Sequence, residues 1–352
     1  MKNSKISNSR YFKAVLLMGM IGMLLSCNDL MLGEEPGNTP TRNFQVMWNE
    51  FDRMYALFEV KNIDWDEVYA EYEPRVNDNI SSNELFDLLS EMLGVLNDGH
   101  VWMVKPEPGF RRYDSGPVYP EGDFNLALVR SKLVEEMLIG NASAPDIIYG
   151  KLEGNLGYIY LENLGQMPGF YQEAMDVIMP YMKGTLGLVI DARGIEGGDD
   201  RSSQALAGYF AKKSLTYMVT KFRNGPGRQD FTSPIIWNTT PSSRDHYDKD
   251  VAVLTNRHTG SAGETFVLAM KTMDHVKVIG DYTFGAFSDN PKRELPNGWI
   301  YSISTGDFRD ASGVSFEGTG IPPQQVVLNT REEIEAGLDR VLEAAILELK
   351  GI

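Results

Sequence analysis

Ser261 lies in a run of small residues, the segment 259–264 (TGSAGE), between a predicted buried strand at 251–255 and a predicted helix that runs to Met273. A serine hydroxyl becomes an effective nucleophile when a base takes its proton and N–H groups stabilise the negative charge that develops. A strand-to-helix turn suits this chemistry, because it raises the side chain into a cleft beside the unpaired N–H groups of the helix start. The alternative is an ordinary helix N-cap, a position that serine often occupies.

A second glycine-rich turn, residues 191–198 (DARGIEGG), follows a predicted buried strand at 186–191. Glycines allow the backbone to approach a substrate closely and to point an N–H group at an oxyanion. A plain connection between a strand and a helix would tolerate the same glycines. Phosphate and dinucleotide loops do not fit, because no Gly-Lys-Ser/Thr sequence follows and the glycine spacing differs.

Histidines are the natural candidates for a base, and the chain has four of them. His100 comes directly after a predicted helix, where a histidine can also simply interact with the helix dipole. His258 is too close in sequence to Ser261 to reach its hydroxyl from the same turn, and we interpret it as a loop or cleft-rim residue. His246 and His275 are expected to be solvated. Four histidines without a His-x-x-x-His pair, and one cysteine, do not predict a zinc site.

The elements around these residues fall into two groups, and the first is a helical subdomain at 42–105. Aromatic and apolar residues recur at helical spacing between 44 and 58. Further helices are predicted to start at Asp64, as an N-cap, and at Ser81, as part of a capping box. The last of them ends at 97–99 (NDG), where asparagine and glycine permit left-handed backbone.

The second group is an α/β core at 151–352, in which predicted strands and helices alternate. Such alternation predicts crossover connections onto a mostly parallel sheet. The connection at 106–150 is rich in glycine and proline at first, and we expect it to be irregular or β-rich. The expected strands are 157–161, 186–191, 251–255, 276–280 and 299–304, and the expected helices are 170–182, 202–212, 261–273 and one closing helix from Thr330.

Residues 1–26 have the features of an export signal, with a basic start and an apolar stretch at 14–25 that is too short to span a bilayer. The stretch ends in Leu-Ser-Cys, and Cys27 is the only cysteine of the chain. This pattern resembles a bacterial lipobox, in which the cysteine is lipidated and becomes the first mature residue. An ordinary signal with an incidental cysteine is the alternative. Residues 27–41 are predicted to be a flexible tether.

The composition excludes some classes of partner. The 352 residues are 42% hydrophobic, enough for at least one sizeable core. A formal net charge of -16 argues against nucleic acid, because nucleic-acid binding needs clustered lysine and arginine. The acidity can also serve only to keep an exported protein soluble.

Five short motifs occur in order along the chain and together resemble the C-terminal processing (tail-specific) peptidase family, in its tricorn-like branch. The resemblance covers residues 42–330. It implies a crotonase-like (ClpP-like) α/β core with an N-terminal helical subdomain, and serine peptidase activity on peptides or unfolded proteins without a cofactor or metal. The chain between His100 and Gly157 is too short for a clear PDZ domain. The motifs are Asp64-Trp65 with Tyr69 and Tyr72, Asp98-Gly99-His100, 191–198 (DARGIEGG), 261–264 (SAGE) and 317–323 (EGTGIPP).

The resemblance also distinguishes two ways of activating the serine. In the processing branch a lysine follows a Gly-x-x-Thr-x-Gly stretch, and here 280–285 (GDYTFG) is followed by Ala286 instead. In the tricorn-like branch a histidine is the base and a glutamate orients it, and His100 and Glu317 match those positions. Without the resemblance, Glu317 would be an ordinary solvated residue of a glycine-rich loop.

The resemblance therefore implies that His100 takes the proton of Ser261, whose attack on a peptide carbonyl gives an acyl-enzyme. The oxyanion would be held by N–H groups of Ala262, Gly197 and Gly198. It also favours a lipid anchor on Cys27 in the outer membrane, facing the periplasm or the cell surface.

Two residues of the glycine-rich turn depart from the family pattern, since Ile195 replaces asparagine and Glu196 replaces a small residue. They are expected to reshape the oxyanion turn or the wall of the substrate pocket. The departure, together with the missing lysine, leaves one alternative function open: a non-catalytic lipoprotein that binds peptides or small ligands in the same cleft.

Overall fold

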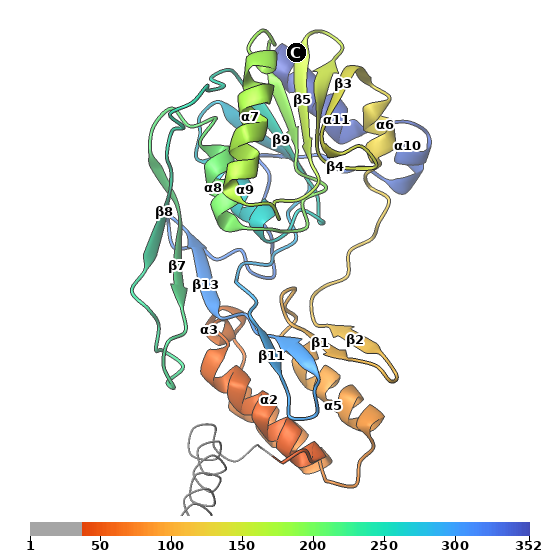
Figure 1. The fold of residues 1–352 in the computed structure, drawn as a ribbon, viewed down its shortest axis with the longest axis vertical. Helices are drawn as coiled ribbons and strands as arrows, with labels where there is room; N and C mark the ends of the chain where they lie inside the picture. Colours follow the sequence, from red (N-terminus) through yellow and green to blue (C-terminus); the bar gives the residue numbers. More distant parts are fainter. Residues whose placement is uncertain (1–36) are drawn as a thin grey trace, which may run out of the picture.

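The computed structural model describes residues 37–352 and shows a larger α/β region above a smaller helical one (Figure 1). The predicted signal peptide at 1–26, Cys27 and most of the predicted tether lie outside the described residues. Within residues 37–352, no helix is long and apolar enough to cross a bilayer.

A seven-stranded sheet forms the centre of the larger region, in the order β14-β10-β9-β6-β5-β4-β3. The first five strands of this order are parallel, and the last two continue the sheet in antiparallel fashion. The central strands are apolar and buried, as expected for a sheet covered on both faces. The strands are β3 (Leu133–Asn141), β4 (Ala144–Leu152), β5 (Leu156–Leu161), β6 (Leu188–Asp191), β9 (Val251–Thr255), β10 (Val276–Gly280) and β14 (Gln325–Val326).

Helices cover both faces of this sheet (Figure 1), which confirms the α/β core predicted from the sequence. One face carries α7 (Pro168–Met182), α8 (Asp200–Ala207) and α9 (Ala262–Lys271). The other carries α6 (Leu126–Arg130) and α11 (Arg340–Lys350).

The predicted start of the core at residue 151 is too late for the sheet, because β3 and β4 form a hairpin whose second strand pairs with β5. The connection at 106–150, predicted to be irregular or β-rich, thus contains β3 and most of β4, and its second half belongs to the core sheet. Strand β3 carries glutamates and is mostly exposed at the edge of the sheet, so its sequence lacks the apolar alternation of a half-buried strand.

The closing helix predicted from Thr330 is in fact two helices, α10 (Arg331–Glu335) and α11. Gly337 has a φ of 84°, which ends the helical backbone, and Asp339 caps the start of α11. The predicted capping box of Thr330 is present at the start of α10.

The helical region contains α2 (Pro40–Met54), α3 (Phe58–Lys61), α4 (Trp65–Tyr72), a 3-10 turn at Glu73–Arg75 and α5 (Ser82–Gly94). The predicted caps are confirmed: Asp64 caps α4, and Ser81 caps α5 in a capping box. The left-handed residue after α5 is Asn97, with a φ of 44°.

A four-stranded sheet completes the helical region with segments from distant parts of the chain (Figure 1). Met103 of β1 pairs with Tyr301 of β12, and both belong to the same apolar core as the helices. The turn at 297–298 is formed as predicted, with Gly298 at a φ of 82°. The order is β11-β12-β1-β2, with β1 (Trp102–Lys105), β2 (Arg111–Asp114), β11 (Lys292–Glu294) and β12 (Ile300–Ser302).

A third sheet extends beside both regions in the order β13-β7-β8 (Figure 1). It is antiparallel throughout and was not predicted from the sequence. Its strands are β7 (Leu215–Phe222), β8 (Ile235–Thr239) and β13 (Gly306–Asp310).

Candidate active site

Ser261 lies between β9 and α9 and has an unusual backbone, with φ 52° and ψ -119°. The N-cap residues Ser81 and Thr330 have the extended backbone that an N-cap normally adopts. Positive φ in a residue with a side chain is strained, and it is found where the surrounding structure enforces it. The Ser261 hydroxyl oxygen lies 3.1 Å from Nε2 of His100. The structure thus places this serine against a histidine in a strained turn, unlike an ordinary cap.

Glu264, a fully buried carboxylate at the start of α9, holds this turn in place through hydrogen bonds. It accepts hydrogen bonds from the Ser261 N–H at 3.1 Å and from the Thr283 hydroxyl at 2.5 Å. It also accepts from the N–H groups of Gly285 at 2.7 Å and Ala286 at 2.8 Å. Burial raises the pKa of Glu264 to about 7, although these hydrogen bonds oppose the shift. One side chain therefore ties the serine turn to the loop at 283–286.

His100 is buried and is held mainly through its backbone. Its N–H donates to Asp98 Oδ1 at 2.8 Å, and its carbonyl oxygen accepts from the Ser302 hydroxyl at 2.5 Å. Asp98 is fixed in turn by the Tyr55 hydroxyl at 2.9 Å. Burial lowers the pKa of His100, and the nearby Asp98 carboxylate opposes this shift. The ring is therefore neutral near neutral pH and can accept the proton of Ser261.

Glu317 is buried close to this cluster, but it makes no hydrogen bond with His100. One carboxylate oxygen is 2.9 Å from Nζ of Lys61, and the other accepts from the Phe287 N–H at 2.7 Å. Burial and the nearby Asp98 carboxylate raise the pKa of Glu317, whereas Lys61 opposes the shift. Within residues 37–352, His100 Nδ1 is buried without a hydrogen-bond partner.

Lys61 links Glu317 to the segment that carries His100, because its ammonium also donates to the Asn97 carbonyl at 3.0 Å. It is nearly buried, with 10% of its side chain exposed. No sequence pattern marks this residue, since a lysine at the end of a short helix is normally solvated. Glu264 was also missed as a site residue, although its spacing of three from Ser261 is that of a capping box.

The glycine-rich turn lies directly over Ser261. A side-chain carbon at Gly197 would be 3.4 Å from Cβ and 3.7 Å from Oγ of Ser261. Gly198 lies against Leu164, where a Cβ would approach the carbonyl carbon to 2.1 Å, and its φ is 149°. Within residues 37–352, the N–H groups of Gly197, Gly198 and Ala262 donate no hydrogen bonds to protein atoms. Gly197 and Ala262 thus offer unpaired donors beside the serine, with Gly198 one residue further away.

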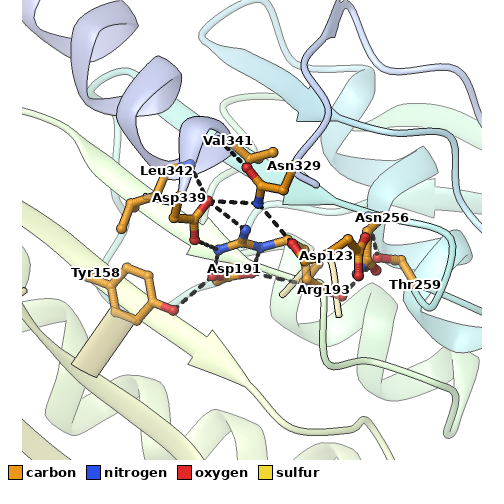
Figure 2. Close-up of polar contacts among 11 residues, drawn as sticks. Asp123, Tyr158, Asp191, Arg193, Asn256, Thr259, Asn329, Asp339, Val341 and Leu342 are labelled. Carbon is orange, nitrogen blue, oxygen red and sulfur yellow. Dashed lines mark hydrogen bonds and ion pairs between the residues drawn. The ribbon is translucent and has the colours of Figure 1, made fainter. Parts of the chain in front are cut away.

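A buried ion network fixes the start of this turn, as Figure 2 shows. Arg193 donates to Asp191 through Nε at 2.9 Å and to Asp339 at the start of α11 at 3.0 Å. The Tyr158 hydroxyl donates to Asp191 at 2.9 Å, and the Asn329 amide donates to Asp339 at 3.0 Å. The arginine of the DARG sequence thus anchors the turn to the core and does not line the pocket that contains Ser261.

Ser261 and His100 line a pocket with a volume of about 310 Å³. Ala286, which stands where the resemblance places a lysine in the other branch, lines this pocket, and no lysine does so among the described residues. His258 is at the rim, with Nε2 3.3 Å from the Pro120 carbonyl oxygen. His246 and His275 do not line the pocket. The lining residues are Gly99, His100, Glu196, His258, Gly260, Ser261, Phe284 and Ala286.

Comparison with known proteins finds two family models and several solved structures that match the chain. Residues 155–327 match Peptidase family S41, and residues 36–94 match the Tricorn protease C1 domain. A solved structure from Parabacteroides merdae, described as a candidate peptidase, is 31% identical with a TM-score of 0.79, over 89% of this chain and 97% of that chain. The structure of mature CPAF has a TM-score of 0.68 at 13% identity, over 89% and 96% of the two chains, and shows a shared fold.

Among curated relatives, carboxy-terminal processing protease CtpA of Bacillus subtilis is 24% identical over 181 residues. Those residues are 51% of this chain but 36% of that protein. The alignment with a CtpA-like serine protease of Staphylococcus saprophyticus covers 29% of its length. The matches thus span about a third of these curated relatives.

Proposed function

Because the chain belongs to peptidase family S41, a family of serine proteases, we propose that it hydrolyses peptide bonds with Ser261 as nucleophile and His100 as general base. The observation that carries this proposal is the 3.1 Å distance between Ser261 Oγ and His100 Nε2. This distance is within hydrogen-bond reach, as proton transfer requires. The substrates are peptides or unfolded proteins.

The proposed reaction proceeds in two halves. His100 Nε2 takes the hydroxyl proton while Ser261 Oγ bonds to the scissile carbonyl carbon, and the N–H groups of Gly197 and Ala262 receive the oxyanion. His100 then gives the proton to the leaving amine as the C–N bond breaks, which leaves an acyl-enzyme. In the second half, His100 takes a proton from water as the water oxygen bonds to the ester carbonyl carbon. The bond between that carbon and Ser261 Oγ then breaks, His100 returns the proton to Oγ, and the peptide leaves with a new carboxyl group.

Two features favour histidine over lysine as the base. Ala286 cannot accept a proton, and it occupies the pocket wall next to Ser261. The lowered pKa of His100 keeps its ring neutral, which is the form that acts as a base.

Glu317 enters the proposal as a positioning residue that acts through Lys61 and the buried cluster. The carboxylates that favour the imidazolium form of His100 during the reaction are those of Asp98 and Asp289. The Lys61 ammonium holds both Glu317 and the Asn97 carbonyl, so it sets the position of the segment that leads to His100.

Labelling with a fluorophosphonate tests the proposal directly. The wild-type protein should become labelled, Ser261→Ala should not, and His100→Gln should be labelled far more slowly. Peptide hydrolysis should fall by at least about a thousandfold in Ser261→Ala. Absence of labelling in a folded wild-type protein would refute the peptidase and favour the peptide- or ligand-binding alternative. Ser143→Ala is a matched control, because Ser143 is exposed in the turn between β3 and β4 and does not line the pocket.

We also propose that the mature protein is anchored in a bacterial membrane through lipid on Cys27, in the outer membrane facing the periplasm or the cell surface. The lipobox-like sequence before Cys27 supports this proposal. Detergent phase partition of the wild type and of Cys27→Ala tests it. The wild type should enter the detergent phase and the variant the aqueous phase, whereas equal partition would contradict the anchor.

A further inference from the structure

Glu196 lies in the candidate active site, but it takes no part in the proposed reaction. It lines the pocket that contains Ser261 and His100, and its side chain is exposed there. Among the described residues, its carboxylate forms neither an ion pair nor a hydrogen bond. It immediately precedes Gly197, so its position relative to the proposed oxyanion turn is fixed by the backbone.

The backbone of this turn cannot move far from the serine. The N–H of Gly260 donates to the Ile195 carbonyl at 2.8 Å. A Cβ at Gly260 would be 3.1 Å from the Glu196 carbonyl oxygen, and a Cβ at Gly263 would be 2.8 Å from the Ile195 carbonyl oxygen. The glycines of the serine turn thus allow the chain at 195–196 to pack directly against it, and Glu196 stays next to the reaction site.

An aromatic wall faces the same pocket. The Phe284 ring packs over Gly99 so closely that a Cβ on Gly99 would lie 2.3 Å from a ring carbon. The same ring packs edge-on against the Tyr119 ring, with 5.4 Å between the two ring centroids. The Tyr119 hydroxyl also donates to the Phe284 carbonyl at 3.2 Å. The pocket thus combines a fixed apolar surface with one unpaired carboxylate.

The neighbouring charged groups have partners of their own. Arg257 lies in the loop before Ser261, but its guanidinium donates to the carbonyls of Thr283 and Thr319 and lies 3.7 Å from Asp281. It lines the adjacent pocket and not the one that contains the serine. Neither Arg257 nor any lysine among the described residues therefore neutralises Glu196.

We propose that Glu196 selects substrates with a lysine or arginine beside the scissile bond, an inference that rests on the proposed peptidase function. Lysine and arginine carry an apolar stem and a cationic end, which match the Phe284 surface and the carboxylate respectively. Pairing a substrate cation with the free carboxylate forms a charge-assisted hydrogen bond, and no protein ion pair has to be broken for it.

The test uses the full-length protein and a set of quenched fluorescent peptides that differ only at the two residues flanking one cleavable bond. Each flanking position carries lysine, arginine, glutamine, leucine or glutamate. The wild type, Glu196→Gln, Glu196→Lys and a control, Glu153→Gln, are compared by kcat/KM. The control removes the same charge from the turn between β4 and β5, outside the pocket. Fluorophosphonate labelling is measured in parallel for each protein.

The wild type and Glu153→Gln should cleave the lysine or arginine peptides about tenfold faster than the glutamine peptide. Glu196→Gln should lose this ratio while labelling continues, and Glu196→Lys should prefer the glutamate peptide. Cleavage and labelling without a basic preference, or a preference that persists in Glu196→Gln, would overturn the selectivity and leave the peptidase standing. Absence of both labelling and cleavage in the wild type would overturn both.

Discussion

Replacing Ser261 by glycine should make the protein more stable than replacing it by alanine, although both variants lose the nucleophile. The backbone at Ser261 has φ 52° and ψ -119°, a conformation that a residue with a Cβ adopts only under strain. Alanine keeps the Cβ and hence the strain, whereas glycine removes both.

The size of the effect follows from two opposing terms. A residue held in a sparsely populated backbone region costs about 1–3 kcal/mol. Glycine also has more conformational entropy in the unfolded chain, and this lowers the free energy of unfolding of the glycine variant by about 0.5–1 kcal/mol. The free energy of unfolding of Ser261→Gly should therefore exceed that of Ser261→Ala by about 1 kcal/mol, the difference between these terms.

Denaturant unfolding of both variants measures this difference. Ala344→Gly provides the control, because Ala344 lies within helix α11 at ordinary helical backbone. There the same exchange should lower stability by about 1 kcal/mol. If Ser261→Gly is no more stable than Ser261→Ala, the strain is not present and the reasoning about the turn is wrong.

Three further outcomes are expected. Lys61→Met leaves the buried carboxylate of Glu317 without its cation and should lower the free energy of unfolding by about 3–5 kcal/mol. The double variant Lys61→Met/Glu317→Gln should restore most of this loss. A double variant that is no more stable than the single one would show that the ion pair does not cause the loss. Burial lowers the pKa of His100, and the neutral ring is the base, so kcat/KM should rise with pH to a plateau with a midpoint below about 6.5. A higher midpoint would exclude a buried neutral His100. Glu264→Gln replaces one carboxylate oxygen by an NH2 group, which then faces the two donors that bonded to this oxygen. Stability should therefore fall by about 2–4 kcal/mol and limited proteolysis should cut the loop at 283–286 sooner, whereas unchanged protection would show that the carboxylate does not hold it.

The sequence predicted the elements whose signals are local. The caps at Asp64 and Ser81 and the apolar strands at 251–255 and 276–280 were predicted correctly, because capping and burial on both faces leave marks on a few adjacent residues. The proximity of Ser261 and His100 required the family resemblance, since no local pattern relates residues so far apart.

What the sequence missed depends on contacts between distant segments. The polar edge strand β3 and the arm β7-β8-β13 have no simple apolar alternation. Lys61 became a buried partner of Glu317 only because the loop at 317 packs onto α3. In this structure Glu317 pairs with Lys61 and accepts from the Phe287 N–H, and it forms no hydrogen bond with His100. That Glu317 orients the ring of His100 stays a prediction.

The sheet β11-β12-β1-β2 determines when the candidate active site can assemble as the chain folds. A ribosome delivers the N-terminus first, yet β1 directly follows His100 and pairs with β12, which is formed by residues 300–302. Contacts between such distant segments form late and slowly. Until residues 300–302 are available, β1 can pair with β2 on one edge but lacks β12 on the other. A chain that already contains Ser261 therefore does not yet hold His100 against it, and the proposed nucleophile and base come together only when nearly all of the chain is present.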